Sequence, residues 1–186
     1  MCCGSPSPNG GSTTLNTTST TPSFSMASLQ APNVVYPLRN PSAAIWGPIM
    51  WEYLHNFGVD NKSEETLKTL TSLLTSLALM LPCTICAATY GRKLVSHPLP
   101  ETPTFENLQR WMFDIHNLIR AQNKQALFAY ENLQVEKVVI PDSKWTSLMG
   151  EMDLAFNRQI TNMGGYQTTL DLFVKLKNGE SLPFIG

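Results

Sequence analysis

The sequence predicts an all-α fold. Apolar residues recur every three or four positions in segments that begin near residues 43, 64, 104 and 142, as they do along the buried face of a helix. No convincing alternation of apolar and polar residues, which is the pattern of a half-buried strand, occurs before residue 130. A chain of 186 residues has room for one domain with tails.

The composition argues against several classes of partner. Charged residues make up 15% of the chain and the net charge is −1, so electrostatics does not favour binding to a nucleic acid or an anionic membrane. The longest apolar-rich stretch, residues 67–81, is shorter than the roughly 20 residues of a membrane span. The N-terminus has no basic region followed by an apolar run, so we expect no secretory signal. Residues 1–40 are rich in Ser, Thr, Asn, Pro and Gly and are predicted to form a disordered tail.

The first helix is predicted from Ala43. Pro48 is placed in its first turn, where the missing N–H of proline costs nothing. Trp51, Leu54 and His55 follow with the spacing of a single helix face.

The second helix is predicted to begin at a capping pair formed by Asn61 and Glu64. Its apolar stripe consists of Leu67, Leu70, Leu74, Leu77 and Leu81. Pro82 is predicted to end this helix and to open the next one, with Cys83 in the first turn and Cys86 on the same side.

Gly91 and a cluster of three prolines are predicted to mark a loop, after which Thr104 caps a helix. The periodic residues of that helix are Leu108, Trp111, Met112, Ile115, His116 and Ile119. Asp142 or Ser143 is predicted to cap a further helix, which Gly164 and Gly165 end. Its periodic residues are Trp145, Leu148, Met149, Met152, Ala155, Phe156 and Ile160. Residues 166–176 are apolar enough to be ordered, but their pattern does not distinguish helix from strand.

The run Cys83-Thr84-Ile85-Cys86 is the motif that carries the chemistry. A Cys-x-x-Cys pair serves either disulfide exchange or metal binding. Zinc needs about four ligands, and the chain has no second such pair, which favours the redox interpretation. A thioredoxin-like fold is disfavoured because its dithiol follows a strand. The first turn of a helix stabilises the thiolate that exchange requires, and an enzyme that regenerates the disulfide needs an electron acceptor such as a flavin.

Three motifs occur in the same order along the chain as in a known protein family. Trp46-Gly47-Pro48 leads to Trp51 and to Leu54-His55, Pro82 precedes the Cys-x-x-Cys pair, and His116-Asn117 lies on a later helix. This order resembles the Erv/ALR family of FAD-linked sulfhydryl oxidases over roughly residues 43–128. The resemblance implies a four-helix bundle with a short fifth helix, bound FAD and a homodimer. It divides the chain into the tail 1–40, an oxidase domain 41–130 and a mainly helical C-terminal extension 131–186.

The resemblance also implies roles for particular residues. Trp51, His55, His116 and Asn117 would contact FAD. Cys83 would exchange electrons with protein dithiol substrates, and Cys86 would lie against the flavin as the charge-transfer thiolate. The reduced flavin would pass two electrons to molecular oxygen and give hydrogen peroxide.

The sequence departs from the family pattern after the His-Asn pair. Arg120 stands where many members have Asn. Many members also have a Gly-Lys-Pro segment that contacts the cofactor, and here the segment that contains Lys124 lies one residue closer to the His-Asn pair. Arg120 and Lys124 are both candidates to neutralise the FAD pyrophosphate. No cysteine follows Cys86, so the second structural disulfide of cellular members is absent. That cysteine set resembles members from large DNA viruses, which implies action in the host cytoplasm or the virion.

Plainer interpretations remain open. Tryptophan and histidine residues taken singly are more often structural than ligand contacts. Three roles are open for Cys2 and Cys3: they are inert residues of the tail, they shuttle electrons from substrates to Cys83, or they carry lipid. The alternative function is a helical interaction module in which the Cys-x-x-Cys pair is structural or binds zinc.

Overall fold

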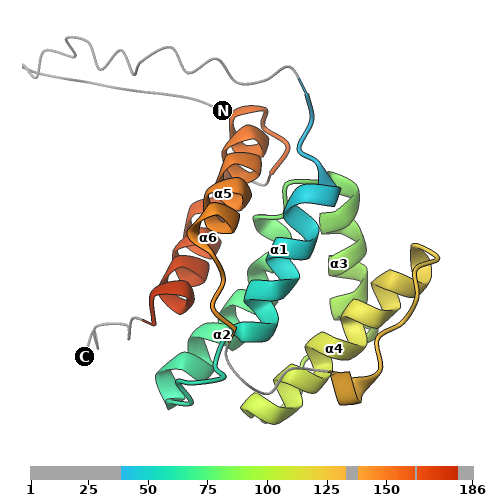
Figure 1. The fold of residues 1–186 in the computed structure, drawn as a ribbon, viewed down its shortest axis with the longest axis vertical. Coiled ribbons are helices and arrows are strands. Elements are labelled where there is room, and N and C mark those ends of the chain that lie inside the picture. The colour runs from blue at the N-terminus through green and yellow to red at the C-terminus, as the bar shows by residue number, and fades with distance from the viewer. Residues whose placement is uncertain (1–38, 133–137, 162, 180–186) are drawn as a thin grey trace, which may run out of the picture. The chain divides into compact units, whose positions relative to one another are not determined.

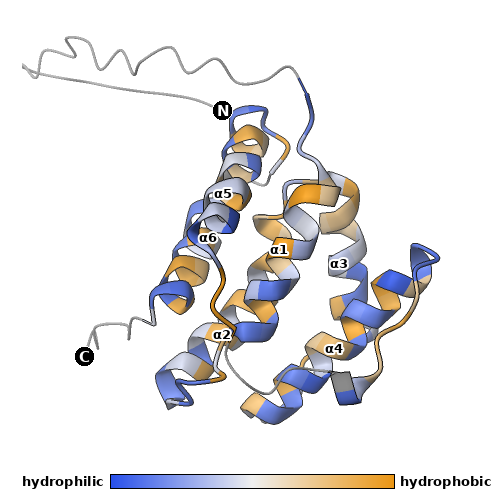
Figure 2. Ribbon diagram, viewed as in Figure 1, coloured by the Kyte–Doolittle hydropathy of each residue, from blue (hydrophilic) through white to orange (hydrophobic). Residues whose placement is uncertain are grey.

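The computed structural model describes residues 39–132, 138–161 and 163–179. Within these ranges the chain forms six α-helices and two 3-10 turns, with no strand, so the all-α prediction is confirmed for them (Figure 1). Each helix carries both apolar and polar residues (Figure 2). Nearly all of the predicted tail, including Cys2 and Cys3, lies outside the described residues, and the predicted domain limits remain predictions.

Helix α1 spans Ala43–Asn56. Its N-terminus is Ser42, whose carbonyl accepts the N–H of Trp46 at 3.1 Å and whose own N–H donates to Glu151, a residue of α5, at 2.6 Å. Pro48 therefore lies inside the helix, and its predicted place in the first turn is wrong. The contact that fixes the start of α1 comes from the far end of the chain, which no local pattern reveals.

Helix α2 spans Glu64–Ser76 and is followed by the 3-10 turn η1, Leu77–Leu79. Its N-cap is Ser63, which accepts the N–H of Thr66 at 3.1 Å, so the predicted cap at Asn61 is wrong. The α-helix also ends before the predicted stop at Pro82. The hydroxyl of Ser76 binds carbonyls of its own helix, and such side chains compete with backbone N–H groups for helical carbonyls.

Helix α3 spans Thr84–Ser96, with Cys83 as its N-cap in extended conformation rather than in its first turn. Gly91 lies inside this helix, so the predicted loop at that position is wrong. A glycine costs a helix interior about 1 kcal/mol relative to alanine, which the surrounding helical residues offset.

Helix α4 spans Phe105–Gln122 and begins as predicted at Thr104. Thr104 and Asn107 form a reciprocal capping box, and Leu108, Met112 and Ile115 are buried along one face. The 3-10 turn η2, Tyr130–Asn132, follows.

Helices α5 (Asp142–Asn157) and α6 (Met163–Asn178) complete the fold. Asp142 is the first helical residue of α5 rather than its cap, and α5 ends before the two glycines that were predicted to end it. Gly164 and Gly165 belong to α6 instead. A side chain at Gly165 would collide with Leu79, so glycine permits α6 to approach η1 closely. Residues 166–176, which the pattern left undecided, are helical.

The helices share one apolar core. Helix α5 packs on α1 and α6 packs on α2, while α4 contacts α1 (Figure 1). Phe173 of α6 is fully buried and its ring lies 5.1 Å from that of Phe57 and 5.7 Å from that of Tyr53. The helices after residue 140 are therefore part of the core that supports α1. Among the described residues, no helix is both long and apolar enough to cross a membrane.

Candidate active site: a dithiol beside an aromatic cavity

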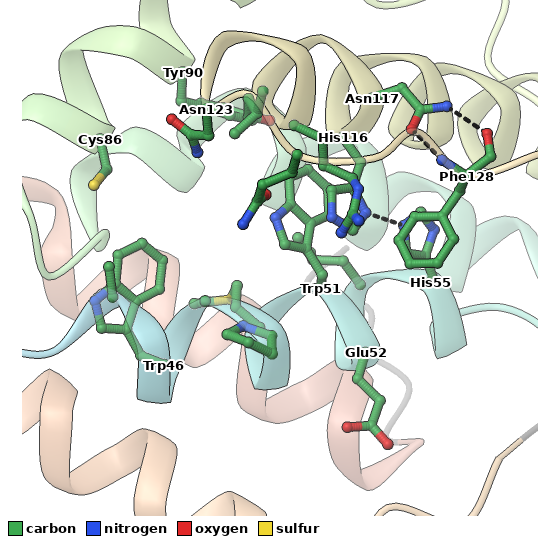
Figure 3. Close-up of a pocket in the computed structure, with 18 of the residues that line it drawn as sticks. Trp46, Trp51, Glu52, His55, Cys86, Tyr90, His116, Asn117, Asn123 and Phe128 are labelled. Carbon is green, nitrogen blue, oxygen red and sulfur yellow. Dashed lines mark hydrogen bonds between the residues drawn. The ribbon is translucent and has the colours of Figure 1, made fainter.

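A cavity of about 800 Å³ is lined by residues of α1, α3 and α4 and of the segment that follows α4. Its walls are mainly aromatic and aliphatic, and Figure 3 shows Trp46 and Trp51 rising into it from α1, opposite Cys86, Tyr90 and His116. Glu52, the one acidic residue among the described residues of the lining, points away from these rings and pairs with Lys144 of α5 at 2.6 Å. A large, flat aromatic ligand fits such a cavity.

Cys83 and Cys86 form a disulfide at the N-terminus of α3, with their Cα atoms 5.2 Å apart. Cys86 lines the cavity. Cys83 caps the helix, and its Sγ accepts the backbone N–H of Cys86 at 3.1 Å. Both residues are half-buried, so this disulfide is reachable. The helix N-terminus can stabilise a thiolate here when the bond opens.

Trp51, His55 and His116 form one stack on the cavity wall. The rings of Trp51 and His116 are nearly parallel, with centroids 4.1 Å apart, and His55 Nε2 lies 3.2 Å from His116 Nδ1 (Figure 3). Burial lowers the pKa of His55 to about 4. Burial, followed by the charges of His55 and Arg120, lowers the pKa of His116 to about 4 as well. Both rings are therefore neutral at pH 7, and one donates a hydrogen bond to the other.

Asn117 fixes the wall behind this stack. Its amide donates to the carbonyl of Phe128 and accepts the N–H of the same residue, each at 3.0 Å (Figure 3). Arg120 donates to the carbonyl of Ala126 at 2.6 Å and its guanidinium lies over the Phe128 ring. These bonds fold the segment after α4 back onto the helix, so that Phe128 lies 5.7 Å from His116.

The structure brings most of the predicted site residues to this one cavity. Its lining includes Trp51, His55, Cys86, His116, Asn117 and Arg120. Lys124 lies instead in the exposed turn after α4, with φ 55°, outside the lining. Their roles toward a cofactor remain predictions.

Sequence reasoning did not select four further residues that line the cavity, namely Trp46, Tyr90, Asn123 and Phe128. Trp46 stands in the Trp-Gly-Pro run and could have been found there. Tyr90 follows Cys86 by one helical turn, and its hydroxyl donates to the carbonyl of Leu74 at 2.6 Å. Asn123 and Phe128 lie beyond α4, where no periodic pattern marks a functional face.

The polar atoms of the cavity fit FAD as a ligand. The indole N–H of Trp46 and Nδ1 of His55 are buried and have no hydrogen-bond partner among the residues that the structure describes, and a ligand would satisfy both. Arg120 supplies a cation at the wall, as a pyrophosphate requires. In the part of the chain that the structure describes, no group of three or more His, Cys, Asp or Glu side chains is arranged to hold a metal ion.

Comparison with known proteins agrees with this geometry. Residues 48–139, which contain the dithiol and the aromatic stack, match the model of the Erv1/Alr family. A protein of Acanthamoeba polyphaga mimivirus named as a probable FAD-linked sulfhydryl oxidase is 27% identical over 106 residues, covering 53% of this chain and 74% of the relative. No solved structure matches the chain significantly. Because the matched region runs from Pro48 of the first motif through the dithiol and the His-Asn pair, and these residues surround one cavity, the chain belongs to the Erv1/Alr family.

Proposed function

We propose that this protein is an FAD-dependent thiol oxidase that forms disulfide bonds in protein substrates. The observation that carries the proposal is the position of Cys86, which joins a disulfide at a helix N-terminus to an aromatic cavity large enough for a cofactor. Family membership and the name of the viral relative, a probable FAD-linked sulfhydryl oxidase, support the same chemistry. The dithiol and its electron acceptor then lie side by side.

The exchange step uses Cys83 as the sulfur that meets substrate. A substrate thiolate attacks Sγ of Cys83, a mixed disulfide forms, and Cys86 leaves as a thiolate on the cavity side. The second thiolate of the substrate then attacks the substrate sulfur that is bonded to Cys83. The substrate disulfide forms, and Cys83 is released as a thiolate. The substrate loses two electrons and two protons, and the enzyme dithiol gains the electron pair.

The neutral His55–His116 pair and the Trp51 ring offer a flat surface without charge, which suits the aromatic part of FAD. Arg120 is proposed to face the pyrophosphate, with Lys124 near enough along the chain to assist. Asn117 is proposed to act through Phe128, whose backbone it holds. The chemistry that bound FAD supplies is acceptance of the electron pair and its transfer to dioxygen, with hydrogen peroxide as product.

The test uses two cysteine variants of the full chain. Cys86→Ala and Cys83→Ala are expected to keep bound FAD and to lose oxygen consumption with dithiothreitol, because each leaves only one redox sulfur. A Cys2→Ser/Cys3→Ser variant serves as the matched control and retains turnover of this small dithiol. A wild-type protein that folds without flavin and carries zinc instead would overturn the proposal in favour of an interaction module.

Two further properties belong to the proposal. We expect a homodimer, which light scattering of the flavin-loaded protein would test by its mass. We also expect action in the cytoplasm of an infected cell or in the virion, because the relative is viral. Fractionation of infected cells and purified particles would locate the protein.

A further inference from the structure

A second, smaller pocket of about 330 Å³ lies beside the first turn of α3. Thr84 and Ala87 line it from α3, whereas Ile85 and Cys86 line the large cavity. Successive residues of an α-helix are rotated by about 100°, so these two pairs point to opposite sides of the helix. The cavity that fits the cofactor and the smaller pocket therefore lie on opposite sides of the helix end that carries the Cys83–Cys86 disulfide.

The outer wall of this pocket comes from the connection between α5 and α6, which lies beyond the family match. That connection is held by a Schellman motif, in which Ile160 N–H donates to the Ala155 carbonyl and Gln159 N–H to the Phe156 carbonyl, each at 2.9 Å. Gln159 has φ 56°, a left-handed conformation that costs a residue with a side chain roughly 1–2 kcal/mol. The motif sets Ile160 and Thr161 against the pocket despite this strain.

Thr161 provides an independent sign of a ligand. Thr161 is only 6% exposed, and within the described ranges its buried hydroxyl has no hydrogen-bond partner. A buried hydroxyl left unsatisfied is unfavourable, and proteins rarely retain one where nothing binds. The described lining residues carry no charged side chain. Leu79, Leu81 and Ile160 give the pocket apolar side chains, and Thr84 brings a second hydroxyl beside that of Thr161.

We propose that this pocket receives the polypeptide substrate next to its reacting cysteine. The inference rests on the proposed oxidase function and adds the place where substrate docks. Exchange requires the attacking sulfur to approach Cys83 on the side away from Cys86, and the cavity lies on the Cys86 side. An uncharged, apolar side chain beside the substrate cysteine occupies the pocket, and a substrate backbone group pairs with the Thr161 hydroxyl.

The first test compares two substrates on the flavin-loaded full chain: reduced, unfolded ribonuclease and dithiothreitol. Thr161→Val keeps the shape of the side chain and removes the hydroxyl. It is expected to raise KM for ribonuclease about two- to tenfold relative to KM for dithiothreitol, the range of one hydrogen bond. Thr146→Val is the matched control, because that exposed hydroxyl binds only the Asp142 carbonyl of its own helix.

The second test reads docking without turnover. In Cys86→Ser protein, the Cys83 thiolate attacks the cysteine sulfur of a short peptide carried as its thionitrobenzoate disulfide. The peptide becomes bonded to Cys83, and the thionitrobenzoate anion that leaves is measured by its absorbance. A peptide with leucine beside its cysteine should react faster than one with aspartate, and Ala78→Leu, which fills the pocket, should remove the difference.

The outcomes separate the two proposals. Equal KM changes for both substrates in Thr161→Val, or equal peptide rates in the unfilled protein, would overturn the docking site while oxidation of dithiothreitol still supported the oxidase. Absence of flavin and of dithiothreitol oxidation would overturn the oxidase itself.

Discussion

Replacement of Phe173 by alanine tests whether the C-terminal helices are part of the fold that holds the site. Phe173 is fully buried, and its ring lies 5.1 Å from Phe57, 5.7 Å from Tyr53 and 5.9 Å from Trp145. Loss of the ring removes its burial and leaves a cavity among three aromatic neighbours. We expect the free energy of unfolding to fall by about 3–5 kcal/mol. Phe173→Leu leaves a smaller cavity and should cost about 1–2 kcal/mol.

Urea unfolding in excess FAD, followed by circular dichroism and by flavin absorbance, measures this change. Leu108→Ala is the matched control, because Leu108 is equally buried and belongs to α4, a helix that lines the cavity. This change should cost about 2–5 kcal/mol. Both variants should unfold in a single transition seen by both signals. An unchanged midpoint for Phe173→Ala, or two separate transitions, would refute the shared core.

Three other changes have definite expected results. Arg39→Ala should lower the free energy of unfolding, because it leaves the buried Glu151 carboxylate with only a backbone donor. Half of the Arg39 side chain is exposed, so the loss should be smaller than for a fully buried ion pair. His55 has a pKa of about 4 in the folded state against 6.5 unfolded, so the folded protein binds fewer protons in that window, and stability should fall by up to about 3 kcal/mol as pH decreases from 6.5 to 4. Trp51→Ala should weaken FAD binding about tenfold by titration, because the stacked wall is lost.

Each of these results has its own control. Arg110→Ala removes an exposed ion pair with Asp114 and should change stability by less than about 1 kcal/mol. His55→Gln should reduce the pH dependence between pH 6.5 and 4 and leave the part that His116 contributes, because burial lowers the pKa of His116 to about 4 as well. An unchanged slope would contradict the role given to burial of His55. Trp111→Ala removes a tryptophan outside the cavity, and an equal loss of flavin in both tryptophan variants would show a general effect on folding.

Local signals in the sequence were enough to predict some elements. Thr104 caps α4 through groups three residues away, and Leu108 and Met112 are buried because the helical repeat puts them on one face. The limits of α1 and α5 depend on distant or strained groups instead. Glu151 fixes the start of α1 from 109 residues away, and Gln159 ends α5 in a conformation that favours glycine.

The same distinction applies to the site. The family resemblance implied that Trp51, His55 and His116 share one site, and the structure places them on one cavity. All three lie on regular helices, where the spacing of a motif is kept in the fold. Phe128 is brought there by the side chain of Asn117, and a non-periodic segment gives no advance sign of such a contact. The small pocket beside α3 requires α6 to pack against η1 and the connection between α5 and α6 to lie beside α3, which only the tertiary structure reveals.

The most direct test of the central claim is the visible absorption spectrum of the purified protein during an anaerobic titration with dithiothreitol. The account predicts flavin bands that bleach as the Cys83–Cys86 disulfide is reduced and that return when air is admitted. A folded protein without flavin bands, or with bands that dithiothreitol does not bleach, would contradict the claim that the dithiol passes electrons to a cofactor in the adjoining cavity.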